Sequence, residues 1–317
     1  MTMATPSRPD AAAPLALRAR VCAELVRHRL VYLMLAPVVA YFLVFQYAPM
    51  IAAVIAFKDY NPAVGIAASP WVGFDWFRQF FDGLFFNRLI WNTLLINLYD
   101  LAFGFPAPIV LALLMNELTS QRFKRFVQTL TYLPHFISVV VIAGMMLDFL
   151  VRDGVVNDII AAFGGRRESL LLNPDYFRRI FVGSEIWQSI GWGSIIYLAS
   201  LAGINPSLYE AAKIDGANRW QQFLHITLPG LTPIIMTMLI LRLGQLMTVG
   251  FEKILLLYNP VTYETADVIS TYVYRRGILE ANYSYAAAVG LFNSALALLL
   301  LFASNRLSRR LTGNSIW

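Results

Sequence analysis

Polar side chains recur at helical spacing inside two long apolar runs of this 317-residue chain, where a bare charge would be costly. On residues 181–203 they share one helix face, and on residues 230–250 Arg242 is followed one turn later by Gln245. Hydrogen-bonding groups beside an aromatic ring suit a hydroxyl-rich ligand. We therefore predict a ligand path lined by Glu185, Gln188, Trp192, Arg242, Gln245 and Asn293.

The charges among these residues have an alternative role, which is to hold helices together. The ionisable residues that lie inside or at the edge of apolar runs are Asp100, Asp148, Glu185 and Arg242. Arg242 could pair with Glu185 or with Asp100. The sequence favours such a structural ion pair and a ligand contact equally. Trp187 and Tyr197 are weaker ligand candidates, because aromatic residues in such runs more often pack against neighbours.

A polar segment, residues 204–229, separates two of the apolar runs and begins with the signals of a short helix. Asn205 is a good N-cap, and Pro206 suits the first helical position, where its missing N–H is no loss. Gly216 can adopt the left-handed backbone that ends a helix. We predict a helix that ends at this glycine.

A second short helix is predicted directly after the first. Asn218 could cap it, and it would run over residues 219–226 until Pro229 and Gly230 end it. Two short helices that meet at a glycine form a compact knob, able to sit in a groove of another protein. The alternative is an ordinary solvated loop between two membrane spans.

The composition is that of a membrane protein. Hydrophobic residues make up 58% of the chain, against roughly 45–50% in soluble domains. Six apolar runs approach the roughly 20 residues that a helix needs to cross a bilayer. These predicted spans are residues 31–56, 90–114, 133–151, 181–203, 230–250 and 285–305. We therefore predict an all-α, polytopic membrane protein.

The distribution of basic residues predicts the orientation of the spans. A cluster of arginines precedes the first span, and short basic loops recur on the same side of the predicted membrane. Under the positive-inside rule both termini are cytoplasmic, and so is the polar segment 204–229. The first apolar run is too long for a cleaved signal peptide, and no small-residue cleavage site follows it.

Several kinds of chemistry are not expected from this sequence. The only cysteine is Cys22, and the three histidines, His28, His135 and His225, lie far apart, so we predict neither an internal disulfide nor a metal site. No phosphate-binding loop and no Ser/His/Asp or Cys/His cluster is present, so the chain should neither hydrolyse ATP nor act as an enzyme. No basic patch interleaved with aromatic residues favours nucleic acid.

The spacing of the polar segment resembles a known loop. It reads E-A-A, three residues, Gly, nine residues, Ile, one residue, Leu-Pro, which is similar to the cytoplasmic loop of binding-protein-dependent ABC importer permeases. The resemblance implies the type I ABC importer permease fold and a loop that docks on an ATPase subunit. The implied docking residues are Glu210, Ala211, Ala212, Asp215, Gly216, Ile226, Leu228 and Pro229.

The resemblance extends along most of the chain. The segments Gly250–Gly277 and Tyr283–Phe292 resemble the carbohydrate-uptake, maltose-permease-like branch, and within it the subgroup for oligo- and polysaccharides. The implied organisation is a basic arm (1–30), a first span with a periplasmic loop (31–86), a permease core (87–305) containing the docking loop, and a cytoplasmic tail (306–317).

The resemblance also implies a specific assembly in the bacterial inner membrane. This chain would pair with a second, homologous permease subunit, and two ATPase subunits, which bind ATP and Mg, would dock from the cytoplasm. A periplasmic solute-binding protein would deliver an oligo- or polysaccharide, and membrane lipid would surround the spans. The chain itself would hold no cofactor. An acidic saccharide such as alginate is one candidate substrate, because Arg242 would suit a uronate.

Two other functions remain open on the sequence. A secondary transporter of small polar solutes, driven by an ion gradient, would also use intramembrane carboxylates. It would have no need of the docking loop. A membrane-embedded polysaccharide transferase would need a catalytic cluster at one interface, and the sequence has none.

Overall fold

The computed structural model describes residues 26–244, 247 and 250–312 and divides the chain into two units, Met1–Val54 and Ile55–Trp317. The described part is helical throughout apart from its loops, and its only β-pairing is one isolated bridge between Lys58 and Trp71. The all-α prediction is therefore confirmed.

The described part of the first unit is one apolar helix. It comprises α2 (Arg29–Phe42), the π-helical η1 (Leu43–Tyr47) and α3 (Ala48–Ala52), and the following 3-10 segment η2 (Ala53–Phe57) crosses the boundary between the units. The helix is long and apolar enough to cross a membrane, and none of its most apolar stretch is buried. It corresponds to the first predicted span.

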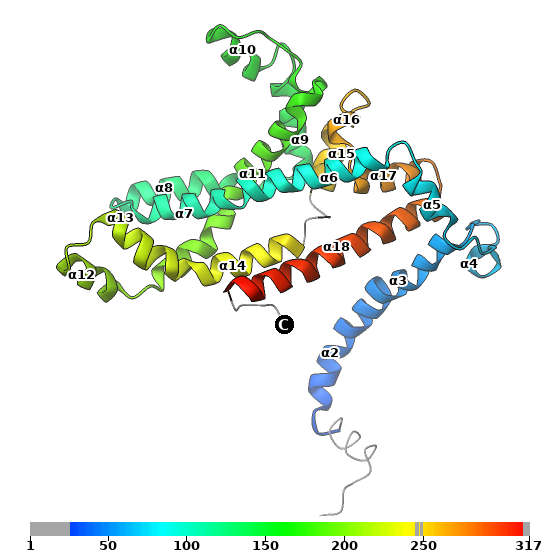
Figure 1. Ribbon diagram of the computed structural model, residues 1–317, viewed down its shortest axis with the longest axis horizontal. Helices are drawn as coiled ribbons and strands as arrows, with labels where there is room; N and C mark the ends of the chain where they lie inside the picture. Colours follow the sequence, from blue (N-terminus) through cyan, green and yellow to red (C-terminus); the bar gives the residue numbers. More distant parts are fainter. Residues whose placement is uncertain (1–25, 245–246, 248–249, 313–317) are drawn as a thin grey trace, which may run out of the picture. The chain divides into compact units, whose positions relative to one another are not determined.

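The second unit is built around long helices that lie side by side (Figure 1). Its first half contains α4 (Gly65–Ala68), α5 (Asp75–Phe81), α6 (Phe86–Tyr99), η3 (Asp100–Gly104), α7 (Pro106–Asn116), α8 (Gln121–Tyr132), η4 (Leu133–Phe136), α9 (Val139–Phe149), α10 (Val155–Ala162) and η5 (Leu170–Leu172). Its second half contains α11 (Pro174–Ala202), α12 (Pro206–Ile214), α13 (Arg219–Gln222), η6 (Phe223–Thr227), α14 (Leu228–Gly244), α15 (Phe251–Leu257), α16 (Tyr263–Ala266), α17 (Ile269–Tyr274), η7 (Arg275–Leu279) and α18 (Tyr283–Thr312).

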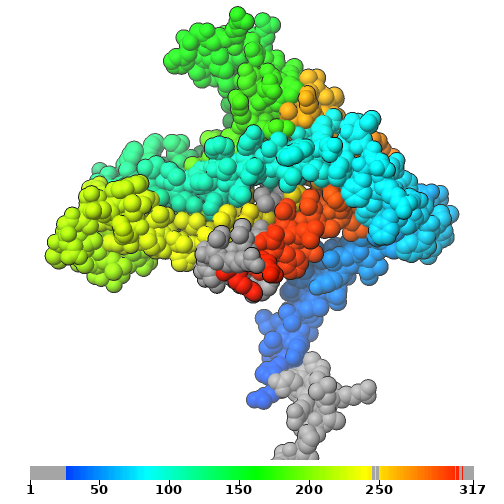
Figure 2. Space-filling view, in the orientation of Figure 1, coloured from blue at the N-terminus to red at the C-terminus, as the bar shows by residue number. Residues whose placement is uncertain are grey.

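Four helices of the described residues are long and apolar enough to span a membrane, and a fifth span is counted if α8 and α9 form one bent segment. The bend between them is 99°, and Figure 2 shows α9 and α10 in green, projecting from the rest of this unit. The predicted count of six is reached only with α11. That helix has 29 residues but is not among the apolar candidates, because it carries charged and amide side chains along its length.

The helix α11 lies at the centre of the second unit. One apolar cluster packs its first half against α6, α9 and α15 through buried residues such as Phe177, Phe181 and Ile254. Another packs its second half against α7 and α14 through Tyr197 and Leu231. Because these clusters cover one side of α11 along its length, that side can carry polar residues inside the protein rather than toward lipid.

Asp267 holds the loop after α15 in place. It is completely buried, and its carboxylate accepts hydrogen bonds from Arg275 at 3.2 and 2.6 Å and from Thr271 at 2.9 Å. Burial alone would lower the pKa of Arg275, but its hydrogen bonds and charge attraction to Asp267 raise that pKa above its ordinary value. Arg275 therefore keeps its positive charge, and its hydrogen bonds to Asp267 hold the start of η7 against the junction between α16 and α17.

Candidate functional site

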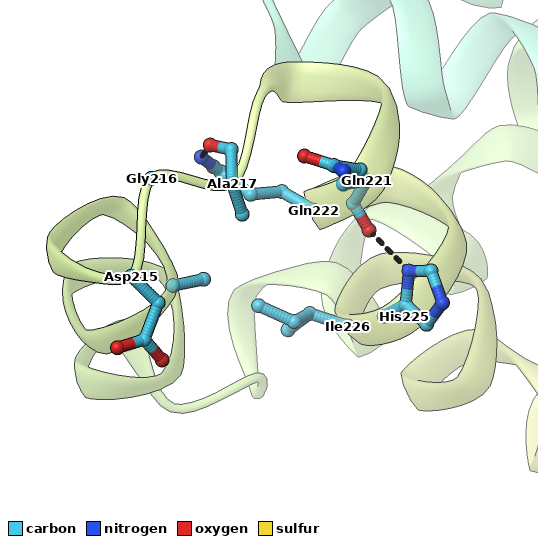
Figure 3. A pocket seen from close by; sticks show the side chains of 8 residues that line it. Asp215, Gly216, Ala217, Gln221, Gln222, His225 and Ile226 are labelled. Carbon is cyan, nitrogen blue, oxygen red and sulfur yellow. Dashed lines mark hydrogen bonds between the residues drawn. The ribbon is translucent and has the colours of Figure 1, made fainter.

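The polar segment 204–229 folds into two short helices that meet at Gly216, as predicted (Figure 3). The side chain of Asn205 caps α12 by accepting from the N–H of Ser207 at 3.0 Å. The helix ends where Gly216 adopts a φ of +78°, a left-handed conformation that residues with a Cβ rarely adopt. The N–H of Ala217 then donates to the carbonyl of Ala212 at 2.8 Å, which satisfies one of the last carbonyls of the helix.

The second helix of the knob begins with a reciprocal N-terminal cap, a capping box. Asn218 accepts from the N–H of Gln221 at 2.9 Å, and the side chain of Gln221 accepts from the N–H of Asn218 at 2.8 Å. A hydrogen bond of 2.9 Å between the hydroxyls of Tyr209 and Thr227 joins α12 to η6. The two helices are thus held together by local polar contacts, which makes the knob a preorganised unit.

One prediction about the knob is wrong. Pro229 and Gly230 do not end the second helix, because the chain continues from α13 through η6 into α14 without a break. The reason is local geometry. Pro229 lies at the second position after the π-helical segment, where the wider turn leaves no regular hydrogen bond for its missing N–H to break.

The surface of the knob is exposed and mixes apolar and charged groups. Glu210, Ala211 and Asp215 are exposed, and Ile214 is 87% exposed although it is a large apolar side chain. A pocket of about 320 Å³ opens between the two helices, and Figure 3 shows Asp215, Gly216, Ala217, Gln221, Gln222, His225 and Ile226 around it. An exposed apolar residue beside a pocket is the pattern of a protein-docking surface.

Two of the predicted path residues meet in a second cavity. Glu185 and Gln188 of α11 line a cavity of about 490 Å³ together with His135 and Lys253. The Nζ of Lys253 lies 2.5 Å from Oε1 of Glu185 and donates to Oε1 of Gln188 at 2.8 Å. The side chain of Lys253 is 2% exposed, so these two partners replace the water that would otherwise solvate its Nζ.

An aromatic platform lies at the edge of this cavity. The ring of His135 stacks on Trp192, with centroids 4.5 Å apart and an interplanar angle of 4°. The cavity therefore contains an ion pair and an amide, and a stacked ring pair begins at its wall with His135. These groups can donate and accept hydrogen bonds and can stack on a sugar ring.

The other predicted path residues do not meet there. Arg242 forms an ion pair with Asp100, whose side chain is 4% exposed. This is one of the two ion pairs that the sequence predicted for helix packing. Asn293 donates to the carbonyl of Met247 at 3.3 Å, in a different part of the unit. Tyr197 is buried in an apolar cluster, while Asp148 and Trp187 are exposed. Gln245 lies outside the described residues.

A family model described as "Binding-protein-dependent transport system inner membrane component" matches residues 104–313, which include the whole knob and the cavity residues. This chain belongs to that family. The predicted family is thus confirmed, and the chain is a permease component of a binding-protein-dependent transport system in the inner membrane.

The permease component is similar to named transport proteins of Bacillus subtilis (strain 168). It is 43% identical over 301 residues to the "Polygalacturonan/rhamnogalacturonan transport system permease protein YteP", covering 95% of this chain and 94% of that one. It is 44% identical over 289 residues to "Protein LplB", covering 91% of each.

Solved structures carry the same fold. A bacterial ABC transporter involved in the import of the acidic polysaccharide alginate has a chain that is 47% identical to this permease component, with a TM-score of 0.87 over 92% of this chain and 99% of that one. A chain of a bacterial alginate ABC transporter, in complex with an alginate pentasaccharide-bound periplasmic protein, is 46% identical with the same TM-score, over 94% and 100%. The predicted ABC importer permease fold is therefore confirmed.

Sequence reasoning missed Lys253 and did not give His135 a role in the cavity. From the sequence alone Lys253 belongs to a loop, because it comes three residues after the end of the fifth predicted span. One signal was present. A carboxylate inside an apolar run, such as Glu185, needs a cation, and Lys253 is among the few candidates in this part of the chain.

Proposed function

We propose that this permease component forms the transmembrane pathway of an ATP-driven importer of an oligo- or polysaccharide. The observation that carries the proposal is the preorganised knob, with its left-handed Gly216, its capped helices and its exposed, partly apolar face. A secondary transporter driven by an ion gradient would have no use for such a knob.

The proposal includes the partners of the chain. Two separate ATPase subunits bind ATP and Mg and perform the hydrolysis, and one of them receives the knob from the cytoplasm. A second, homologous permease subunit completes the pathway, and a solute-binding protein delivers the saccharide on the periplasmic side. The complex of one structural neighbour with a saccharide-bound periplasmic protein supports this arrangement.

The proposed substrate is an acidic saccharide. The named YteP relative transports polygalacturonan or rhamnogalacturonan, and the structural neighbours import alginate, so acidic polymers recur among the similar proteins. In the cavity, Lys253 could exchange its bond to Glu185 for one to a substrate carboxylate. Gln188 and the stacked rings of His135 and Trp192 would then hold the hydroxyls and the face of the sugar ring.

This path is tested by uptake into proteoliposomes that contain the complete assembly and sugar-loaded binding protein. Exchanging Lys253 for Met and Glu185 for Gln together keeps the cavity neutral, so the assembly should survive. We expect uptake of an oligouronate to fall at least roughly tenfold, the effect of losing about 1.4 kcal/mol of contact energy. Lys124→Met on α8, outside the cavity, is the matched control and should transport normally.

The outcome that would contradict this path is normal uptake in the assembled double variant. Equal losses for a neutral oligosaccharide and an oligouronate would retain the path but remove the acidic substrate from the proposal. A transport-competent assembly that accumulates the saccharide without ATP would contradict the proposed function as a whole.

The proposed orientation places both termini and the knob in the cytoplasm. We expect a reporter fused after Gly313 to be active in its cytoplasmic form, because the arginine-rich N-terminal arm and the basic short loops favour that side. A second reporter in the loop between α10 and α11 should be active in its periplasmic form. The reverse pattern at both positions would overturn the orientation.

A further inference from the structure

A larger cavity, of about 860 Å³, lies along the first half of α11 and has no part in the proposed transport path. One wall is the start of α11, and the other is formed by Tyr99 at the end of α6 and Phe103 of η3. On an ideal helix, the α11 positions in this groove are centred roughly 120° away from Glu185 and Gln188. The groove therefore opens on a different side of α11 from the polar cavity.

The end of the groove near the start of α11 is basic. Arg178 is fixed there, because its Nη2 donates to Oδ1 of Asn92 at 2.7 Å and its Nε donates to the carbonyl of Thr265 at 3.3 Å. Arg179 is exposed and makes no ion pair or hydrogen bond with any residue that the structure describes. Asp175 is the one acidic residue of the lining, so the two arginines leave a net positive charge.

The other end of the groove is apolar. Beyond the arginines, α11 contributes Val182, Gly183 and Ile186, which face the rings of Tyr99 and Phe103. Nothing lies within 4 Å of the position that a Cβ on Gly183 would occupy, so the glycine leaves a trough in the helix surface. Ile186 lies beside η3, since a Cβ on Gly104 would be 3.8 Å from its Cγ1.

The depth of these groups agrees with the dimensions of a bilayer. Tyr99 and Phe103 are near the middle of the 31-residue apolar helix Phe86–Asn116. Arg179 is seven residues from Ile186, or about 10 Å along the helix axis, and half of a bilayer's hydrocarbon core is about 15 Å. A guanidinium on a flexible stem covers the remaining distance to the interface.

We propose that this groove binds an anionic phospholipid of the inner membrane. The headgroup phosphate pairs with Arg179 beside the fixed Arg178, and one acyl chain lies in the trough over Gly183 against Tyr99 and Phe103. Charge complementarity selects an acidic headgroup, and the apolar trough selects a lipid rather than a free phosphate. The inference depends on membership of the membrane family and not on the identity of the transported saccharide.

The test is lipid titration of the purified full assembly, measured by native mass spectrometry with phosphatidylglycerol and phosphatidylcholine. We expect the assembly to retain phosphatidylglycerol preferentially. Arg179→Gln should weaken that binding roughly fivefold, as expected for one arginine near an anionic headgroup. Gly183→Leu should weaken it as well, because the leucine fills the trough without changing the charge. Arg166→Gln, the same change on an exposed loop, should have no effect.

Four results would overturn the proposal. The first is equal retention of phosphatidylglycerol and phosphatidylcholine, and the second is unchanged retention in both Arg179→Gln and Gly183→Leu. The third is efficient cross-linking of Gly183→Cys, in a Cys22→Ala background, to the second permease subunit, which would show that protein fills the groove. Displacement of the lipid by inorganic phosphate alone would likewise exclude the acyl trough. Arg179 is exposed, so its exchange for Gln should leave the fold intact.

Discussion

Replacing Gly216 with Val is expected to abolish transport and to separate the ATPase from the membrane subunits. At a φ of +78° a β-branched side chain costs at least roughly 1–2 kcal/mol, and the turn between α12 and α13 would change its angle to relieve that strain. Nothing within 4 Å would clash with the new Cβ, so the effect comes from the backbone and not from crowding. The measurement is co-purification of the ATPase with the permease, together with uptake by the reconstituted assembly.

The chain offers a matched control for this change. Gly164 has a φ of +82° and also has nothing within 4 Å of its Cβ position, but it follows α10, in a segment far along the chain from the knob. Gly164→Val should therefore impose the same backbone strain and leave ATPase co-purification unchanged. If both variants lose the ATPase equally, general destabilisation explains the result and the docking role of the knob is contradicted.

Glu210→Lys tests the same interface through charge alone. Glu210 is exposed on α12 and makes no ion pair with a described residue, so its exchange should not disturb the fold. We expect the saccharide affinity of the binding protein to be unchanged, because that binding takes place away from the knob. Hydrolysis of ATP should no longer respond to loaded binding protein. If loaded binding protein still stimulates ATP hydrolysis and transport is normal in this variant, the loop does not couple transport to ATP hydrolysis.

The second large effect is expected at the ion pair between Arg242 and Asp100. Arg242→Ala leaves the carboxylate of Asp100, 4% exposed, without its cation, and loss of one partner of such a pair destabilises a protein by about 3 kcal/mol. We expect the yield of assembled complex to fall sharply. The measurement is the thermal unfolding midpoint and the recovery of the complex after purification.

A double variant separates packing from ligand contact at this pair. Exchange of Asp100 for Asn and Arg242 for Gln together removes both charges and retains hydrogen-bonding groups, so most of the lost assembly should return. Normal transport in the restored complex would assign the pair to packing. Loss of transport in a fully assembled complex would instead place Arg242 in the ligand path, as the sequence alone also allowed.

The outcome at the knob shows what local signals can predict. Its helix caps and its left-handed glycine depend on residues a few positions apart, so the sequence alone predicts them. The one local error concerned Pro229. Proline usually ends a regular α-helix, but the π-helical η6 lets the chain continue into α14. No residue pattern in the sequence predicts that wider turn.

The sequence by itself therefore determined the family, the helical membrane class and the two-helix knob, because periodicity, composition and capping are properties of neighbouring residues. Only the tertiary structure decided which charges meet. Lys253 and Gln188 are 65 residues apart, and Arg242 and Asp100 are 142 apart. The first of these pairs depends on how α11 packs against α15 and the second on where α14 lies relative to η3, and helix periodicity carries no information on which faces of different helices come together.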